Sequence, residues 1–291
     1  MKYSIIHLIV TFMICTCCQQ TISAATPSST DTITMQHGYS KVNGINMYYE
    51  IYGQGAPIVL IHGGGSTIQS TFEKVIPLLS KTRKVIAVEL QAHGRTSDRA
   101  QEETFEQDAD DVAGLLKNLK IDKADFFGFS NGGTTTMQIA IRYPEIVNKI
   151  ILGSALCKRS GVPAQFWGFM EHATIDNMPQ ELKTAFLKVN PDPKALQTMH
   201  DKDAHRMVHF KDIPDEQIKS ITAPTLIIIG DKDLITPEHA IEMQRLIKNS
   251  EVAIIPGGHG EYLGIIMTPQ SDGKQADYVI PMIESFLNKT R

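Results

Sequence analysis

"DFFGFSNGG", Asp125 to Gly133, places Ser130 two positions from Gly128 on one side and two positions from Gly132 on the other. The residues ADFF before the serine predict a strand, and GTTTMQIAIRY after it predicts a helix. A serine on a strained corner between strand and helix needs neighbours without side chains, because the two elements must approach closely there. The stretch therefore predicts a nucleophile elbow with the serine at its tip.

On both sides of this corner, short apolar runs alternate with stretches of helical spacing. The runs, which include PIVLIHGGG, KVIAVEL, KIILGSA, PTLIIIGD and EVAIIPGG, show no polar alternation, and this is typical of strands buried on both faces of a parallel sheet. Stretches such as TFEKVIPLLSKT and PEHAIEMQRLIKN favour helices on both faces of that sheet. Residues 38–155 and 223–291 are therefore predicted to form one α/β core with a mostly parallel sheet.

Two segments depart from the alternation. GYSKVNGINMYYEIYG, residues 38–53, predicts an antiparallel hairpin, because Asn43-Gly44 is a favoured two-residue turn. Residues 156–222 hold helix-like segments and no convincing strand, so they predict a small helical cap inserted into the core. In the cap, QFWGFMEH contains Phe166, Trp167 and Met170, which we interpret either as the core of the insertion or as the lining of an apolar acyl or aryl pocket.

Four polar residues of the cap could suggest a metal site. His205 and His209 lie four apart in a helix-like stretch, with Asp201 and Asp203 close by. Such a histidine pair supplies only two ligands, and no motif places a third. We interpret the four residues as a solvated helix face and predict no metal.

A serine hydroxyl becomes a nucleophile when a base takes its proton, and the base needs a carboxylate that orients it. His259, in the glycine-flanked loop IIPGGHGEY, follows the last apolar run and is free to reach across the edge of the sheet. The segment LIIIGDKDLITPEH offers Asp231 and Asp233 where the preceding strand ends. Their positions alone allow either carboxylate to serve.

From about Gly38 to the C-terminus the sequence resembles the α/β-hydrolase superfamily. The resemblance is carried, in chain order, by HGGG (62–65), ELQAHGRTSD (89–98), GFSNGG (128–133), GDKDLITP (230–237) and PGGHG (256–260). The order Ser, Asp, His along the chain is that of this superfamily. The resemblance implies an α/β-hydrolase fold with a catalytic triad of Ser130, Asp233 and His259, and it makes Asp231 a turn residue.

The same resemblance implies an oxyanion hole made of two backbone N–H groups. They belong to Asn131, directly after the nucleophile, and to Gly64 in the HGGG motif. The ring of His62 is expected to brace this loop by hydrogen bonding rather than to transfer a proton.

These residues predict a serine hydrolase that cleaves carboxylic esters through an acyl-enzyme and needs no cofactor. Its expected partner is a small-molecule ester or related acyl substrate. Hydrolysis of a C–C bond, a lactone or an aminoacyl (peptide) bond on the same triad stays an alternative, because one fold supports many reactions. A ligand-binding protein with slow turnover is the alternative outside catalysis. With 28 Lys and Arg against 32 Asp and Glu, the net charge of -4 argues against nucleic acid as a partner, and the oligomeric state stays open.

The N-terminus predicts export. Residues 1–25 combine Lys2, a short apolar run and a small-residue exit, the pattern of a signal peptide, and residues 26–37 form a polar linker. The protein is therefore expected in the periplasm or outside the cell. Cys15, Cys17 and Cys18 leave a lipoprotein signal open, which would bring the chain to a membrane by a lipid anchor near the N-terminus.

Overall fold

The apolar runs form one sheet in the computed structural model, which describes residues 35–268 and 273–290. Its eight strands are β1 (Met35–Val42), β2 (Ile45–Tyr52), β3 (Ala56–Ile61), β4 (Arg83–Val88), β5 (Ala124–Phe129), β6 (Val147–Gly153), β7 (Thr225–Gly230) and β8 (Ser250–Ile255). Their order across the sheet is β1-β2-β4-β3-β5-β6-β7-β8. The pairs β1/β2 and β2/β4 are antiparallel and the other pairs are parallel, so the predicted α/β architecture with a mostly parallel sheet is confirmed.

The hairpin at the start of the sheet forms where the sequence predicts it. Asn43 and Gly44 connect β1 to β2 with φ of 43° and 90°, the left-handed backbone that such a tight turn requires. β1 begins at Met35, three residues before the predicted start of the core, because residues 35–37 continue the antiparallel pairing with residues 50–52. The predicted signal peptide and most of the predicted linker, residues 1–34, lie outside the described residues.

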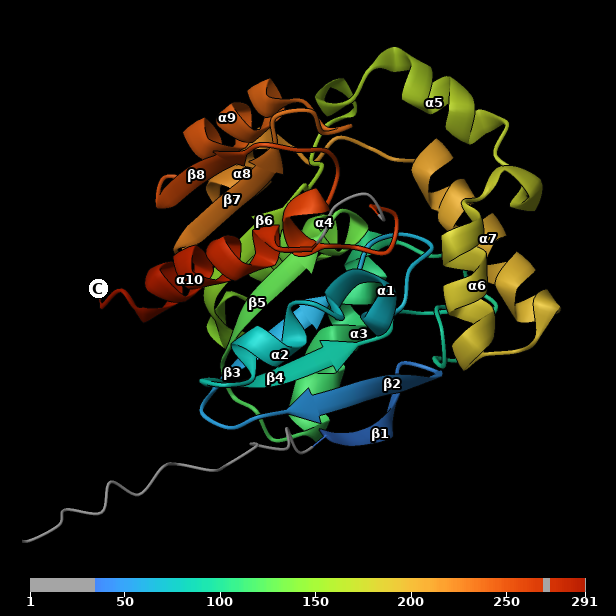
Figure 1. Ribbon diagram of the computed structural model, residues 1–291, viewed down its shortest axis with the longest axis horizontal. Helices are drawn as coiled ribbons and strands as arrows, with labels where there is room; N and C mark the ends of the chain where they lie inside the picture. The colour runs from blue at the N-terminus through green and yellow to red at the C-terminus, as the bar shows by residue number, and fades with distance from the viewer. Residues whose placement is uncertain (1–34, 269–272, 291) are drawn as a thin grey trace, which may run out of the picture. The chain divides into compact units, whose positions relative to one another are not determined.

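Helices cover both faces of the sheet (Figure 1). The described helices are α1 (Ile68–Phe72), α2 (Ile76–Leu79), α3 (Phe105–Asn118), α4 (Asn131–Arg142), α5 (Ala164–Glu171), α6 (Gln180–Val189), α7 (Pro193–Val208), α8 (Asp215–Lys219), α9 (Pro237–Leu246) and α10 (Gln275–Asn288). α3, α4 and α9 share one buried apolar cluster with the sheet, and α1, α2 and α10 share the other. Among the described residues, none of these helices is long and apolar enough to cross a membrane.

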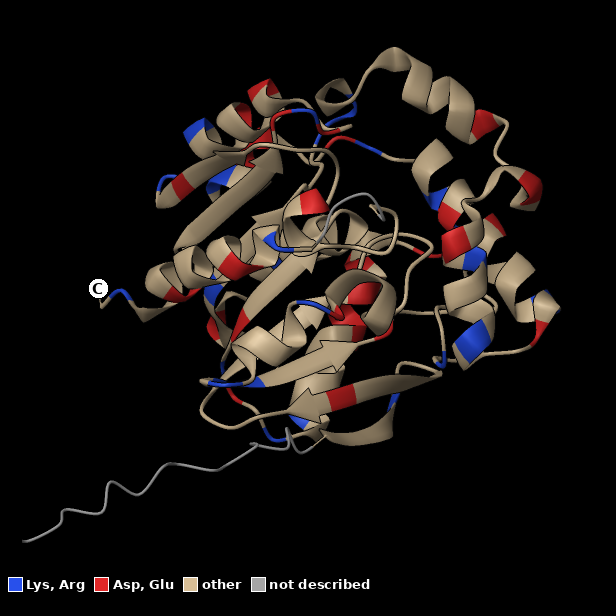
Figure 2. Cartoon of the chain, in the orientation of Figure 1, with Lys and Arg blue, Asp and Glu red and all other residues tan. Residues whose placement is uncertain are grey.

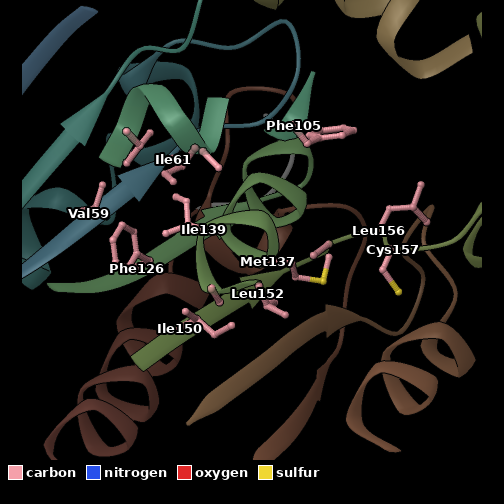
Figure 3. Close-up of a cluster of buried hydrophobic side chains, with 14 of the residues drawn as sticks. Val59, Ile61, Phe105, Phe126, Met137, Ile139, Ile150, Leu152, Leu156 and Cys157 are labelled. Carbon is pink, nitrogen blue, oxygen red and sulfur yellow. The ribbon is translucent and has the colours of Figure 1, made fainter. Parts of the chain in front are cut away.

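β3 shows why its apolar run has no polar alternation. Val59 and Ile61 belong to the cluster under α3 and α4, whereas Ile58 and Leu60 belong to the cluster under α1, α2 and α10, and all four are fully buried. Side chains alternate between the two faces of a strand, and here both faces are covered. Figure 3 shows the first of these clusters, in which side chains of α4 lie among those of β3, β5 and β6.

The insertion between β6 and β7, residues 156–222, contains helices and no strand among its residues, all of which the structure describes. α6 and α7 contribute to a small apolar cluster that also reaches the loop after β4; its buried members are Ala92, Met178, Leu182, Phe186, Leu196 and Met199. α8 lies elsewhere, because it packs against α4 and α9 beside the sheet. Figure 1 shows α5, α6 and α7 beyond the carboxyl ends of the parallel strands, the edge where polar side chains of several strands meet.

Charged residues of both signs are interspersed over the helices and loops (Figure 2). The strands of the sheet carry few charged residues in the same view. This distribution agrees with the small net charge of -4.

Candidate active site

Ser130 occupies the corner between β5 and α4 with φ of 54° and ψ of −121°. This backbone conformation is one that residues with a side chain rarely adopt. A Cβ atom on Gly128 would lie 2.0 Å from the carbonyl oxygen of Gly132, and a Cβ atom on Gly132 would lie 2.2 Å from the carbonyl oxygen of Ile61. The two glycines are therefore required by the close approach of helix and strands, as the sequence pattern indicates.

Loops after three strands bring a serine, a histidine and an aspartate together. The Nε2 atom of His259, in the loop after β8, lies 3.2 Å from the Oγ atom of Ser130. The Nδ1 atom of the same ring lies 2.7 Å from Oδ1 of Asp233, which follows β7. The carboxylate of Asp233 is fully buried, whereas the His259 side chain is 27% exposed and accessible from the cavity. The arrangement can pass a proton from the serine to the imidazole while the carboxylate holds the ring.

Asp233 is held by more than the histidine. Its Oδ2 atom accepts a hydrogen bond of 2.6 Å from the Ser154 hydroxyl, and its Oδ1 atom accepts one from the backbone N–H of Ile235 at 3.0 Å. Burial alone would raise the pKa of Asp233, but hydrogen bonds from His259 and Ser154 hold it below its usual range. Asp231 instead accepts a hydrogen bond from the backbone N–H of Gly257 at 2.7 Å, so it orders the neighbouring loop.

Ser154 is a residue that the sequence analysis missed. It follows β6 directly, in ILGSA, and its hydroxyl also lies 2.9 Å from the hydroxyl of the buried Tyr262. The position of Ser154 in the sequence is a signal for a site residue, because a polar residue at the carboxyl end of a parallel strand lies at the same edge as the other site residues.

Gly64 and Asn131 lie beside Ser130 in the wall of one cavity. Neither backbone N–H donates a hydrogen bond to another described residue, so both are available to an oxyanion. His62 lies behind the loop. Its Nδ1–H donates to the carbonyl of Gly63 at 2.8 Å, and its Nε2 accepts from the backbone N–H of Leu90 at 3.1 Å. Burial lowers the pKa of His62 to about 3, which keeps the ring neutral.

The cavity in front of Ser130 has a volume of about 280 Å³ and a mostly apolar wall. Phe166 and Met170 lie in this wall, four residues apart on α5. Trp167 does not, and the interpretation of it as a pocket residue is wrong. Trp167 is the next residue along α5 after Phe166. Its indole N–H donates to the carbonyl of Arg159 at 3.0 Å, and the centre of its ring lies 5.7 Å from the centre of the Phe210 ring. Trp167 therefore belongs to the core of the insertion.

Asp203 is the second residue that the sequence analysis misjudged. The sequence predicts a solvated helix face for Asp203 together with His205 and His209. The two histidines are exposed, but Asp203 is buried and lies in the cavity wall. Its carboxylate contacts His93 at 3.2 Å and forms an ion pair with Arg206. The described residues hold no group of three or more His, Cys, Asp or Glu side chains arranged to bind a metal ion.

The Asp203 ion pair is part of a buried charged cluster. Burial would raise the pKa of the Asp203 carboxyl, but Arg206 and His93 hold it well below its usual range. Burial alone would lower the pKa of His93, whereas the carboxyls of Asp203 and Glu103 raise it to about 9. For Glu103 burial dominates and raises its pKa to about 8. Burial thus favours the neutral form of Glu103, and the neighbouring carboxyls favour the protonated form of His93.

Comparison with known proteins identifies the family. The sequence profile of the alpha/beta hydrolase fold matches residues 56–205, about half of the chain. The chain belongs to this family. As an α/β hydrolase it is 28% identical to 2-hydroxy-6-oxo-2,4-heptadienoate hydrolase of Pseudomonas putida over 72% of this chain and 84% of that protein. It is 27% identical to the human serine hydrolase BPHL over 75% of this chain and 77% of that protein.

Solved structures agree with the α/β-hydrolase fold. A meta-cleavage product hydrolase from Pseudomonas fluorescens superimposes with a TM-score of 0.71 at 24% identity, covering 86% of this chain and 98% of that one. At this level of identity the likeness supports the fold. The chain is thus a hydrolase of the α/β-hydrolase family. The bond that it cleaves depends on the chemistry of the site.

Proposed function

We propose that the protein is a serine hydrolase that cleaves uncharged carboxylic esters through an acyl-enzyme. His259, oriented by Asp233, takes the proton of Ser130 as its hydroxyl attacks the ester carbonyl. The backbone N–H groups of Gly64 and Asn131 stabilise the oxyanion, and the alcohol leaves with the proton from His259. Water then attacks the acyl group by the same steps and releases the acid. The contacts of 3.2 Å and 2.7 Å along Ser130, His259 and Asp233 support this assignment.

The observation that carries the ester assignment is the chemistry of the cavity wall. Five methionines line it: Met170, Met178, Met199, Met207 and Met267. Together with Phe166 and Phe169 they offer an apolar and adaptable surface, because methionine side chains are flexible. No Lys or Arg is among the described residues that line the cavity. A neutral substrate suits such a wall, since an unpaired charge in it would be poorly solvated.

Hydrolysis of a C–C bond is the second candidate, because one of the similar proteins is named for a heptadienoate substrate. Such a substrate carries a carboxylate, which needs a cation or several hydrogen-bond donors when it is buried. The described wall residues include no Lys or Arg to pair with it, and this supports an ester as the substrate. An aminoacyl substrate would instead need a free carboxylate for its ammonium group. Asp203 is the only carboxylate among the described wall residues, and Arg206 and His93 already neutralise it.

Two measurements test the assignment. Fluorophosphonate labelling should modify Ser130, as identified by peptide mass. Steady-state turnover of p-nitrophenyl acetate should fall at least about 10⁴-fold in Ser130→Ala, whereas Ser285→Ala on the exposed face of α10 should leave it unchanged. Undiminished turnover in Ser130→Ala would refute the proposal. A burst of one product equivalent without further turnover would favour the ligand-binding alternative.

A substrate panel distinguishes the bonds. Short aryl esters, lactones, amino-acyl amides and 2-hydroxy-6-oxo-dienoates should be compared by kcat/KM. We expect uncharged esters to lead, with lactones next because they are cyclic esters. A dienoate that outperforms every ester would show that the cavity accepts a carboxylate, and the C–C candidate would replace the ester assignment.

We further propose that the enzyme works in the periplasm or outside the cell, which rests on residues 1–25 alone. Mass analysis of the protein recovered from cell fractions should find a chain that starts after Ala24 or Ala25 in the exported fraction. Incorporation of labelled palmitate would instead assign a lipid anchor to Cys15, Cys17 or Cys18. A full-length chain confined to the cytoplasm would refute export.

A further inference from the structure

Asp203 lies where the insertion meets the loop of the predicted oxyanion hole. It occupies the middle of α7, yet its carboxylate accepts a hydrogen bond from the backbone N–H of Gly65, 138 residues away in sequence. Its other oxygen accepts a hydrogen bond of 3.3 Å from the side-chain amide of Asn131. One side chain of the insertion therefore holds both segments that provide the oxyanion donors, the loop of Gly64 and the first residue of α4.

The contact is close enough to determine the position of the loop. A Cβ atom on Gly64 would lie 2.9 Å from Oδ2 of Asp203 and 2.6 Å from Nδ2 of Asn131, so a residue with a side chain would push the three groups apart. The peptide group between Gly64 and Gly65 is planar, which couples the N–H of Gly65 to the backbone of Gly64. By binding the N–H of Gly65, Asp203 restricts the rotation of the segment that presents the N–H of Gly64.

A carboxylate at this place would repel a developing oxyanion if its charge were not balanced. Arg206 pairs with Oδ1 of Asp203, and His93 lies 3.2 Å from Oδ2. Arg206 also binds Asp108 at 2.7 Å and lies 3.6 Å from Glu103, whose pKa is raised by burial. The cluster thus neutralises the carboxylate while leaving it able to accept hydrogen bonds. This is the arrangement that a positioning role requires, and it leaves no free charge for a substrate cation.

We propose that Asp203 is a positioning residue for the oxyanion hole, so that catalysis by Ser130 depends on the seating of α7 against residues 62–66. The inference rests on the proposed function, because it assigns a role in the same hydrolytic reaction. It makes the helical insertion part of the catalytic machinery as well as a wall of the cavity. A purely electrostatic role predicts the opposite sign, since removing a negative charge near the oxyanion would speed the reaction.

The test compares Asp203→Asn with Asp201→Asn. Both variants remove one negative charge from α7, but Asp201 is exposed, and among the described residues its side chain has polar contacts with Gln197 and His200 alone. We expect Asp203→Asn to lower kcat for p-nitrophenyl acetate by at least about 100-fold, the effect of losing one oxyanion donor, with KM changed less than about threefold. Asp201→Asn should keep both constants.

An inhibitor series provides a readout that lost stability would not move. A trifluoromethyl ketone forms a tetrahedral adduct with the serine and uses the oxyanion hole, whereas the matching methyl ketone binds as a ground-state analogue. In Asp203→Asn the affinity for the trifluoromethyl ketone should fall in parallel with kcat, and the affinity for the methyl ketone should stay within threefold. Equal losses for both inhibitors would overturn the positioning role.

Two outcomes separate this inference from the proposed function. If wild-type turnover does not depend on Ser130, the proposed function fails. If turnover depends on Ser130 but Asp203→Asn keeps kcat within threefold or raises it, only the inference fails. Should Asp203→Asn not fold, as judged by circular dichroism, Asp203→Glu keeps the charge for Arg206 and His93 and moves the carboxylate by one methylene. The same loss of kcat at constant KM is expected there, and an unchanged kcat would overturn the inference.

Discussion

The backbone of Ser130 should lower the stability of the protein, and replacement by glycine should reveal by how much. Its φ of 54° and ψ of −121° lie in a region that costs a residue with a side chain about 1–3 kcal/mol. Ser130→Ala keeps this cost, whereas Ser130→Gly removes it. Both variants lose the hydroxyl and its contact of 3.2 Å with His259, so that loss cancels when the two are compared.

The expected difference follows from three contributions. Relief of the backbone conformation favours glycine by about 2 kcal/mol, the middle of the range above. The greater freedom of glycine in the unfolded chain costs about 0.5–1 kcal/mol. Loss of the half-buried Cβ atom costs less than the roughly 0.8 kcal/mol of a buried methylene. Ser130→Gly should therefore be more stable than Ser130→Ala by about 1 kcal/mol, which is about 2–4 °C in Tm for a protein of this size.

Chemical denaturation followed by circular dichroism measures the difference, and Ser285 supplies the matched control. Ser285 is exposed within α10, where the backbone is helical, so glycine there should be less stable than alanine by about 1 kcal/mol. The sign of the glycine-alanine difference should thus reverse between the two sites. If glycine is the less stable residue at both, the elbow stores no strain and the argument for it is wrong.

Three further predictions concern the elbow, the acid and the charged cluster. Gly132→Ala should abolish folding, because its Cβ atom would lie 2.2 Å from a carbonyl oxygen of β3. Gly168 on α5 has open space around it, so Gly168→Ala should stabilise the protein by about 0.5–1 kcal/mol in the same denaturation assay. Asp233→Asn should reduce kcat by about 10³–10⁴-fold at nearly constant KM, since the amide favours the tautomer of His259 that cannot accept the proton of Ser130. Steady-state kinetics showing less than a tenfold loss would contradict this. The pKa of about 9 for His93 exceeds the ordinary value of about 6.5, so its protonation stabilises the fold fully below pH 6.5 and this contribution is lost as the pH rises through 9. The free energy of unfolding of the wild type should exceed that of His93→Gln by on the order of 1–3 kcal/mol more at pH 6 than at pH 10. A difference between the two proteins that does not change with pH would refute the charged state of the ring.

The features that could be predicted from the sequence are those that neighbouring residues determine. The strand β3 is apolar at four successive positions because both of its faces are covered, and the pattern alone indicates this. Gly128 and Gly132 are needed by contacts within the elbow and with the adjacent strand. Neighbouring residues do not decide between Asp233 and Asp231 as the triad acid, since both follow β7. Only the family resemblance distinguishes them. The structure gives the reason, because Asp231 is occupied by the loop at Gly257.

The features that could not be predicted depend on contacts between distant segments. Trp167 and Phe166 are adjacent in an apolar helix, and the sequence does not tell which of them faces the cavity and which faces Phe210. Asp203 looks like a surface residue of a polar helix, because its partners His93 and Asn131 lie 110 and 72 residues away. Buried charges are rare, so a composition-based reading assigns such an aspartate to solvent.

The same electrostatics bears on the release of the product. The proposed hydrolysis of a neutral ester would turn one half of the substrate into a carboxylate inside a wall where the described residues offer no Lys or Arg. The charge of Asp203 in the same wall is balanced by Arg206 and His93, so neither of these two cations is free to hold the acid. An anion in an apolar cavity is poorly solvated and leaves for water, while the alcohol has already departed. The proposed preference for an uncharged ester would thus be accompanied by weak binding of its acid product.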